Sequence, residues 1–471
     1  MPKPDQDDFL PASAAPPRAA LRTLGCRLNQ TETEALRRGL EAAGYRIVSW
    51  GEPAELCVLN SCTVTESADA KTRRALRGAR RVNPRARLAL VGCFAQTQGR
   101  WAAELGLADI VVGNGKKMAL PSLLEGLAAG AGPLVVTPPI SREPLTHPTL
   151  ADLRGPTRAA LKVQDGCDFM CTFCIIPTAR GRARPRKLAN LLAEAEAMAE
   201  AGVREVVLTG VNLGTFREGG AGFPELLDRL DAVKGFSRIR ISSIEPTTVP
   251  AGVLERMADP AHKAVPFLHL PLQSGSDTIL RAMRRRYDAA QYRRFAEEAL
   301  ERVPALALGT DVLVGFPGED EAAFGETLAL LKALPFAYFH VFPYSARAGT
   351  PAVRLPEAVP AAVRRNRVGQ LRRLGRSKRS GFFERFEGET RSVLFERPSK
   401  QGMAQGYTDN FIRVRVPMGA HTAGPEALRN RLIPVRLRQA DANAAAVDDA
   451  MEGRLDGAPG GALDGELETG P

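Results

Sequence analysis

Strand-like and helix-like segments alternate along most of this 471-residue chain, and that order limits the folds open to it. Short aliphatic runs are each followed by an amphipathic, helix-capable stretch. Such alternation is typical of α/β domains with parallel sheets, in which ligands bind where the carboxyl ends of the strands gather. Residues that directly follow a strand are therefore the first candidates for functional groups.

Three cysteines follow three separate predicted strands in the first part of the chain. The stretches "AALRTLGC", "ELCVLNSC" and "ARLALVGC" end at Cys26, Cys62 and Cys93. An amphipathic helix with Leu36 and Leu40 on one face is expected after the first of them, and "ADIVVGNG" predicts a fourth strand. Because these strands are expected in one parallel sheet, three thiols that are distant in sequence can converge at its edge.

A second α/β run follows a Pro- and Thr-rich stretch, residues 133–156, which we expect to be a linker. Repeated strand–helix units over roughly 200 residues predict a full or partial (β/α) barrel with its active site at the carboxyl ends of the strands. A basic, helix-capable segment comes next, and then alternating β-branched and polar residues that predict a small β-barrel. The predicted organisation is a disordered arm (1–19), an N-terminal parallel-sheet α/β domain (20–132), the linker (133–156), a central barrel (157–380), a C-terminal β-barrel (381–440) and an acidic disordered tail (441–471).

Charge and composition narrow the class of protein. The net charge of +11 favours a polyanionic partner such as nucleic acid, although an Arg-rich composition alone would also raise it. No stretch approaches the roughly 18 apolar residues that a membrane span needs, and the acidic, Pro-containing start argues against a secretory signal. An odd count of seven cysteines then favours a metal or redox role in the cytoplasm over a disulfide framework.

The stretch "QDGCDFMCTFCIIPTARG" carries Cys167, Cys171 and Cys174 in a Cys-x3-Cys-x2-Cys pattern. Structural zinc usually takes four protein ligands, often as paired Cys-x2-Cys units, and only one such unit is present. Three thiolates on a four-iron cluster leave one iron open for a substrate or cofactor. The pattern therefore favours a catalytic iron–sulfur site over structural zinc.

This pattern, with Phe173 before the last cysteine, is the signature of the radical S-adenosylmethionine (SAM) superfamily. From about residue 20 to 440 the chain resembles the methylthiotransferases of that superfamily, through "TLGCRLNQTETE", "NSCTVTESADAKTRR", "VGCFAQ", "LTGVNLGTF", "HLPLQSGSD", "TDVLVGFPGE" and "PYSARAGTPA". The resemblance implies that Cys167, Cys171 and Cys174 hold a [4Fe–4S] cluster for radical chemistry with SAM. It implies a second [4Fe–4S] cluster on Cys26, Cys62 and Cys93, and an RNA-binding TRAM-like C-terminal barrel.

Three motifs resemble the branch that acts on N6-threonylcarbamoyladenosine at position 37 of tRNA: "TLGCRLNQTETE", "LTGVNLGTF" and "FCIIPTARG". Thr31 and Pro185 depart from its pattern, and neither is a predicted ligand. The alternatives are the branch that acts on N6-isopentenyladenosine, the branch that acts on a ribosomal protein, and a non-catalytic iron–sulfur protein that binds RNA. The resemblance further implies a tRNA partner and an electron donor such as flavodoxin or ferredoxin.

The remaining candidates are polar residues at strand ends and in the basic segments. Gly210, Asn212, Ser243, Glu245 and Asp311 are expected to contact SAM. Cys57, His269 and His340 are expected to be core residues, and Phe411 is expected to pack in the barrel core rather than stack on a base. Two sets are candidates for contacts with tRNA phosphate. The first is Arg180, Arg182, Arg184 and Arg186, which could instead hold the cofactor or the cysteine loop. The second, which could instead be only an exposed helix face, is the run Arg364, Arg365, Arg367, Arg372, Arg373, Arg376, Lys378 and Arg379.

Overall fold

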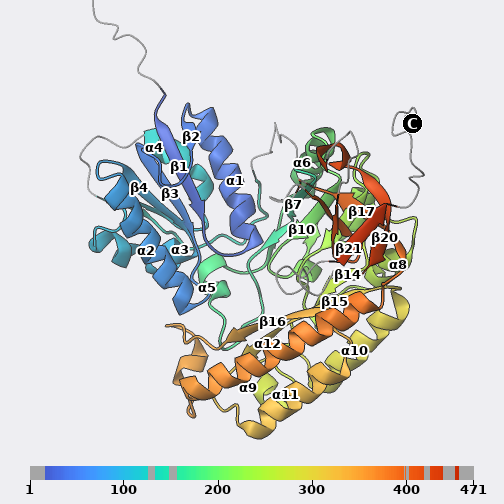
Figure 1. Cartoon of the computed structure of the whole chain (residues 1–471). Coiled ribbons are helices and arrows are strands. Elements are labelled where there is room, and N and C mark those ends of the chain that lie inside the picture. The colour runs from blue at the N-terminus through green and yellow to red at the C-terminus, as the bar shows by residue number, and fades with distance from the viewer. Residues whose placement is uncertain are drawn as a thin grey trace, which may run out of the picture. The chain divides into compact units, whose positions relative to one another are not determined.

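The computed structural model describes residues 16–125, 133–147, 156–396, 398, 403–417, 425–438 and 451–455 (Figure 1). Contacts divide the chain into two compact units. The first is Met1–Ser141 with Thr178–Arg180, and the second is Arg142–Pro177 with Gly181–Pro471. Among the described helices, none is long and apolar enough to cross a membrane.

The first unit is built on a six-stranded sheet in the order β2-β1-β3-β4-β5-β6, with every pairing parallel. Helices cover both faces of the sheet, so its central strands are buried, and all six residues of β3 are buried. The elements are β1 (Arg18–Thr23), α1 (Arg27–Ala42), β2 (Arg46–Val48), β3 (Leu56–Ser61), α2 (Glu66–Val82), β4 (Arg87–Gly92), α3 (Cys93–Glu104), β5 (Ile110–Val112), α4 (Leu120–Glu125) and β6 (Leu134–Val136).

Two helix pairs supply the cores on the two faces of this sheet. Leu36 and Leu40 of α1 pack with Leu120 of α4 on one face, as the pattern of α1 predicts. Leu76 of α2 and Phe94 of α3 pack on the other. Strand β6 lies inside the stretch predicted to be a linker, and three residues were too short a run to signal it.

Six strands of the second unit form two parallel groups of three, β13-β10-β7 and β14-β15-β16. Parallel bridges from Ile239 to Ala264 and from Ser243 to His269 join the groups into one partial barrel, as the sequence predicts. The strands are β7 (Arg158–Lys162), β10 (Glu205–Thr209), β13 (Arg238–Ile241), β14 (Phe267–His269), β15 (Ala307–Val314) and β16 (Tyr338–Pro343).

Helices cover the outer face of this partial barrel (Figure 1). On β16 the outward residue Phe339 is buried against α12, where a Cβ on Gly375 would lie 3.2 Å from its ring. Residues alternate along a strand, so Tyr338, His340 and Phe342 point to the inner face. The helices are α6 (Leu188–Glu200), α7 (Phe223–Asp231), α8 (Val253–Ala258), α9 (Asp277–Ala282), α10 (Ala289–Arg302), α11 (Glu321–Ala333) and α12 (Ala361–Glu384).

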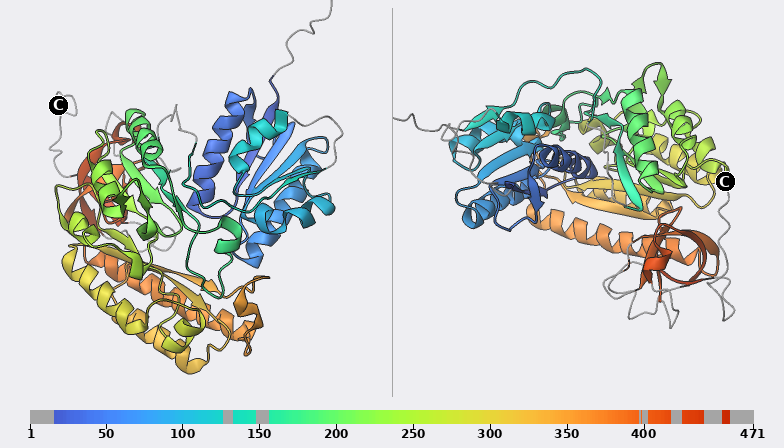
Figure 2. Two further views of the ribbon diagram at one scale, coloured as in Figure 1. Left: turned by 180° about the vertical axis from the view of Figure 1, so that it is seen from behind. Right: turned by 90° about the horizontal axis from the view of Figure 1, so that it is seen from above.

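Helix α12 leads into a small closed barrel in the strand order β17-β18-β19-β21-β20 (Figure 2). Its strands are β17 (Thr390–Phe395), β18 (Ala404–Thr408), β19 (Arg413–Val416), β20 (Leu432–Arg438) and β21 (Met451–Leu455). Strand β21 falls within the predicted acidic tail, so that prediction is wrong for these five residues. It pairs with β19 and β20 through backbone hydrogen bonds, which need no apolar side-chain pattern.

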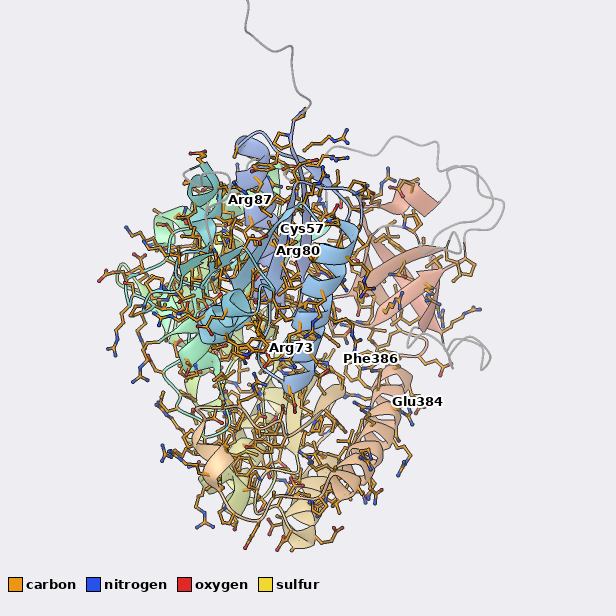
Figure 3. All side chains as sticks on the ribbon, turned by 90° about the vertical axis from the view of Figure 1, so that its left-hand side faces the viewer. Cys57, Arg73, Arg80, Arg87, Glu384 and Phe386 are labelled. Atoms are coloured by element: carbon orange, nitrogen blue, oxygen red, sulfur yellow. The ribbon has the colours of Figure 1, made fainter. Side chains whose placement is uncertain are left out.

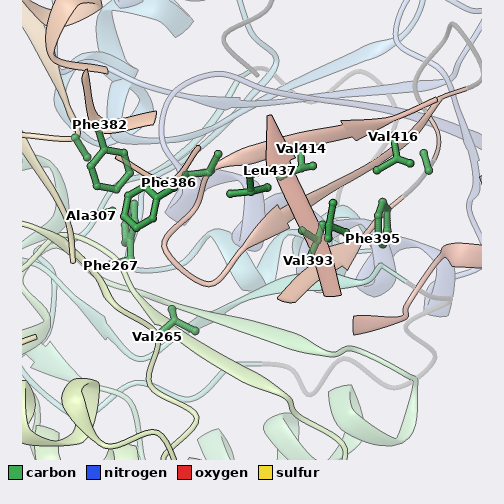
Figure 4. Packing of buried hydrophobic residues seen from close by; sticks show 14 of the residues in the cluster. Val265, Phe267, Ala307, Phe382, Phe386, Val393, Phe395, Val414, Val416 and Leu437 are labelled. Atoms are coloured by element: carbon green, nitrogen blue, oxygen red, sulfur yellow. The ribbon is translucent and has the colours of Figure 1, made fainter. Parts of the chain in front are cut away.

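The barrel packs against the parallel sheet of the same unit (Figure 4). Phe411 stacks on Tyr407 with ring centroids 4.7 Å apart and meets Phe267 of β14 edge-on at 5.3 Å. The Arg240 guanidinium lies 4.6 Å from the Phe411 ring and bonds Glu205 at 2.7 Å. Phe411 therefore packs, as expected, but between the barrel and the sheet.

Candidate functional site

Cys62 and Cys93 directly follow β3 and β4, and Cys26 lies three residues past the end of β1, so each stands just past a strand as the sequence predicts. Gly25 has a φ of 109°, and a Cβ there would lie 2.7 Å from the Cys62 Cβ, so the first two turns touch. Burial, with a smaller contribution from negative charge on Cys93 and Cys26, raises the pKa of the Cys62 thiol to about 11. The three thiols therefore share one edge of the sheet.

A buried charge network lies beside these thiols. Glu32 of α1 accepts hydrogen bonds from Arg180 at 3.1 Å and pairs with Lys117, and all three side chains are at most 2% exposed. Asn114 links the network to the site, because its Nδ2 donates to the Cys93 Sγ at 3.4 Å and its Oδ1 accepts from Lys117 at 2.7 Å. The sequence analysis missed Glu32 and Lys117, since nothing in the local pattern marks them as buried.

The charges of the Glu32 network suit the binding of a negatively charged group by the nearby thiols. Within the network two cations share one carboxylate, and the Arg180 charge lowers the pKa of Cys62 and so favours its thiolate. Thiolate-bound iron–sulfur clusters carry negative charge at their ligands, which buried cations stabilise. The arrangement is therefore suited to the predicted second cluster.

The loop with the other three cysteines is held by a short antiparallel pair, β8 (Gln164–Asp165) with β9 (Arg184–Pro185). Gly166 between them has a φ of 71°, and a Cβ would lie 2.0 Å from the Arg182 carbonyl oxygen. Burial raises the pKa of Cys167 to about 11 and of Cys174 to about 12, so these thiols are protonated at neutral pH until a metal replaces the proton.

A buried arginine that the sequence analysis missed ties this loop to the strand ends. Arg285 donates to the Cys171 Sγ at 3.3 Å and to the Tyr287 hydroxyl at 2.9 Å, and it pairs with Glu245. Tyr287 in turn donates to the carbonyl oxygens of Pro271 and Leu272. Arg285 thus joins one predicted cluster ligand to one predicted SAM contact.

Four of the five predicted SAM contacts lie at the carboxyl ends of β10 and β13. Gln164 fixes the Gly210 loop, because its Oε1 accepts from the amides of Val211 and Asn212. The Asn212 Oδ1 accepts from Thr248, while its buried Nδ2 has no partner among the described residues. A buried donor without a partner is costly, and it fits a polar ligand at this place. Ser243 and Glu245 follow β13 in the same region.

Asp311, the fifth predicted SAM contact, lies with two histidines instead of with the other four. Its Oδ1 is 3.2 Å from the His269 Nε2 and 3.1 Å from the His340 Nδ1. His269 is buried, as predicted, but the His340 side chain is 56% exposed, so its prediction as a core residue is wrong. Strand periodicity places His340 on a face of β16, but which face the helices cover depends on the tertiary fold.

The basic candidates divide between buried and exposed positions. Arg180, Arg184 and Arg186 are buried, and Arg180 pairs with Glu32 and Arg186 with Glu194, while the Arg182 side chain is 40% exposed. On α12, Arg367 is buried with Glu319, whereas four residues are exposed: Arg365, Arg372, Arg373 and Arg376.

Cys57 is buried within β3, with its Sγ 3.6 Å from the Asn83 Nδ2, which suits the structural thiol that was expected (Figure 3).

Comparisons with known proteins agree with this architecture. The model of the radical SAM superfamily matches residues 161–331, and that of uncharacterized protein family UPF0004 matches residues 18–113. A solved radical S-adenosylmethionine methyltransferase, TsrM from Kitasatospora setae, aligns with a TM-score of 0.52 at 16% identity over 70% of this chain and 75% of its own. The fold and the matched model define a radical SAM enzyme, whose cofactors are SAM and [4Fe–4S] clusters.

Curated relatives narrow the class. Threonylcarbamoyladenosine tRNA methylthiotransferase MtaB of Bacillus subtilis (strain 168) is 36% identical over 89% of this chain and 94% of its own length. MtaB of Aquifex aeolicus (strain VF5) is 38% identical over 84% and 96%. A tRNA-2-methylthio-N(6)-dimethylallyladenosine synthase of Cereibacter sphaeroides is 35% identical over 90% and 97%. The chain belongs to the family of radical SAM tRNA methylthiotransferases and is a transferase.

Replacing Glu32 with Ala should destabilise the protein by about 3–5 kcal/mol, because it leaves Lys117 and Arg180 buried without their shared carboxylate. The matched control is Glu34→Ala on the same helix, where a part-exposed carboxylate pairs with Arg37 and about 0–1 kcal/mol is expected. Urea unfolding measures both free energies. Equal values for the two variants would contradict the role given to Glu32.

Proposed function

We propose that the protein adds a methylthio group to C2 of N6-threonylcarbamoyladenosine next to the anticodon of tRNA. The observation that carries this is the presence of two separate sets of three cysteines, one where β1, β3 and β4 of a parallel sheet end and the other in a single loop after β8. The two MtaB relatives, which match nearly the whole chain, favour the threonylcarbamoyl substrate.

In this proposal each set of cysteines holds one cluster. Cys167, Cys171 and Cys174 hold the cluster that works with SAM, and Cys26, Cys62 and Cys93 hold the second. When bound, the first cluster supplies the electron that cleaves SAM, and the second provides an open iron for sulfur. Asn212 and Glu245, fixed by Thr248 and Arg285, orient SAM together with Gly210 and Ser243.

Hydrogen bonds from the protein's own groups order the site around Cys167, Cys171 and Cys174. Arg285 holds Cys171 and Glu245 in fixed relation, and Gln164 holds the Gly210 loop against the cysteine segment. A flavodoxin or ferredoxin is the class of electron donor that suits this chemistry. The exposed arginines of α12 and the barrel that follows them offer positive charge for the phosphates of tRNA.

One comparison supports a second candidate substrate, the adenosine that carries a dimethylallyl group on N6. The Cereibacter sphaeroides relative is named for dimethylallyladenosine and is almost as similar as the MtaB proteins. The base and its reacting carbon are the same in both substrates, so the branches differ in the group on N6.

Mass spectrometry of tRNA nucleosides from a deletion strain tests the proposal. We expect 2-methylthio-N6-threonylcarbamoyladenosine to disappear and to return with a plasmid copy. A plasmid copy with Cys174→Ala, matched by the structural Cys57→Ala, should fail where the control succeeds. Loss of the methylthio mark on isopentenyladenosine instead would move the protein to the other branch, and persistence of both marks would contradict a role in tRNA methylthiolation.

Neutralising Arg372, Arg373 and Arg376 together as Gln should flatten the salt dependence of tRNA binding. Each phosphate contact contributes roughly 0.7 to 0.9 to the slope of log K against log salt, so a decrease of about two is expected. The control replaces exposed arginines of α10 that pair with acids on their own helix or nearby, Arg293 and Arg302. Filter binding from low to moderate salt measures the slopes, and an unchanged slope in the triple variant would exclude α12 from the RNA interface.

A further inference from the structure

Two exposed rings stand on the inner face of β16. The side chain of His340 is 56% exposed and Phe342 is 43% exposed, with ring centroids 6.2 Å apart. The outward residue Phe339, which lies between Tyr338 and His340, is buried, so at this part of the strand the exposed ring is on the inner face. An imidazole and a phenyl ring presented together at the inner face of a (β/α) barrel form a candidate ligand surface.

The imidazole of His340 is held by a chain of hydrogen bonds that crosses three strands. Asp311 of β15, its register partner, lies 3.1 Å from the His340 Nδ1 and 3.2 Å from the His269 Nε2. The other nitrogen of His269, Nδ1, is 3.0 Å from the Tyr338 hydroxyl. With both rings neutral, the two histidines donate to the one Asp311 oxygen and His269 accepts from Tyr338.

These hydrogen bonds determine how the other ring nitrogen of His340, Nε2, can bond a ligand. A carboxylate oxygen can only accept, so the His340 Nδ1 that faces Asp311 carries a proton, and in the neutral imidazole the Nε2 is then an acceptor. Among the described residues, none makes a hydrogen bond to the His340 Nε2. The site therefore offers one oriented acceptor beside one exposed aromatic face.

The hydrogen-bonded group of Tyr338, His269, Asp311 and His340 packs against buried residues beneath it. Tyr338 stacks on Phe267 with centroids 5.8 Å apart, and Gly309 makes room for it, since a Cβ there would lie 2.1 Å from the Tyr338 Cζ. Phe267 is in turn covered by Phe411 of the C-terminal barrel. This packing restricts the rotation of Tyr338 and of the side chains hydrogen-bonded to it, which suits residues that must position a ligand.

We propose that His340 and Phe342 hold the acceptor adenine of the RNA, with Phe342 against its face and the His340 Nε2 accepting from its exocyclic N6–H. Bases taken out of a nucleic-acid stack are held by aromatic side chains and by hydrogen bonds to their edges. An N6-monosubstituted adenine keeps one N–H on that nitrogen. Contact at N6 leaves C2, on the far side of N1, free to react.

The inference rests on the proposed RNA methylthiotransferase function but not on the branch, since both candidate substrates carry an N6–H. His340 and Phe342 bind the substrate, and Asp311, His269 and Tyr338 are positioning residues. The side chains of His269, Asp311 and His340 also have possible metal-ligand atoms within 4.8 Å of one another, and they could instead bind a divalent metal. A base is favoured over a metal for two reasons. The three side chains already hydrogen-bond to one another, and Phe342 adds an apolar surface that a metal site does not need.

The test compares two anticodon stem–loop RNAs that differ by one group, adenosine or purine riboside at the acceptor position. Purine riboside lacks the exocyclic amine. We expect the reconstituted wild-type enzyme to bind the adenosine RNA about tenfold more tightly, and His340→Ala to reduce that ratio to about one. Asp311→Asn should reduce it in part, and His262→Gln, in the loop before β14, should leave it unchanged. Phe342→Leu should weaken both RNAs equally, because stacking does not involve the amine.

Three outcomes would overturn the inference. One is a His340→Ala enzyme that keeps the wild-type ratio, and another is a Phe342→Leu enzyme that binds both RNAs as the wild type does. The third is one zinc ion per chain, found by equilibrium dialysis of the wild type and lost in Asp311→Asn, which would assign these side chains to a metal. A wild type that binds neither RNA and leaves tRNA unmodified would instead remove the proposed function.

Discussion

The parallel arrangement of strands is the constraint on which both sites depend. In each unit the carboxyl ends of neighbouring strands meet at one edge, so residues far apart in sequence reach the same place. Cys26, Cys62 and Cys93 have no compact motif, yet each follows a strand of the same sheet. In the other unit the same geometry sets Asn212 and Glu245, from different strands, within hydrogen-bonding distance.

Burying these groups has an energetic cost that the structure meets with specific partners. Three of the six candidate ligands have thiols whose pKa burial raises to about 11 or 12, so metal binding must displace protons and is coupled to the formation of the site. Buried cations reduce that cost beside each set of cysteines. Burial raises the pKa of both Cys62 and Cys171, and the charges of Arg180 and Arg285 oppose that rise at Cys62 and Cys171 respectively. The polar network is thus part of each site and not only of the fold.

Periodicity and strand ends allowed much of this to be predicted from sequence. The Leu36–Leu40 face, the strand preceding each cysteine and the two α/β regions all follow from local patterns. Strands β6 and β21 could not be predicted, because they are short and are held by backbone pairing. Glu32 with Arg180, and His269 with Asp311 and His340, could not be paired either, because each group depends on strand register and helix packing that no local pattern records.

The central claim is that the two sets of cysteines hold two separate clusters. Iron and sulfide analysis of the anaerobically reconstituted protein tests it most directly, in the wild type and in two variants that replace either Cys26, Cys62 and Cys93 or Cys167, Cys171 and Cys174 with Ala. The account predicts about eight irons per chain in the wild type and about four in each variant. Four irons in the wild type, or a variant that keeps all eight, would contradict it.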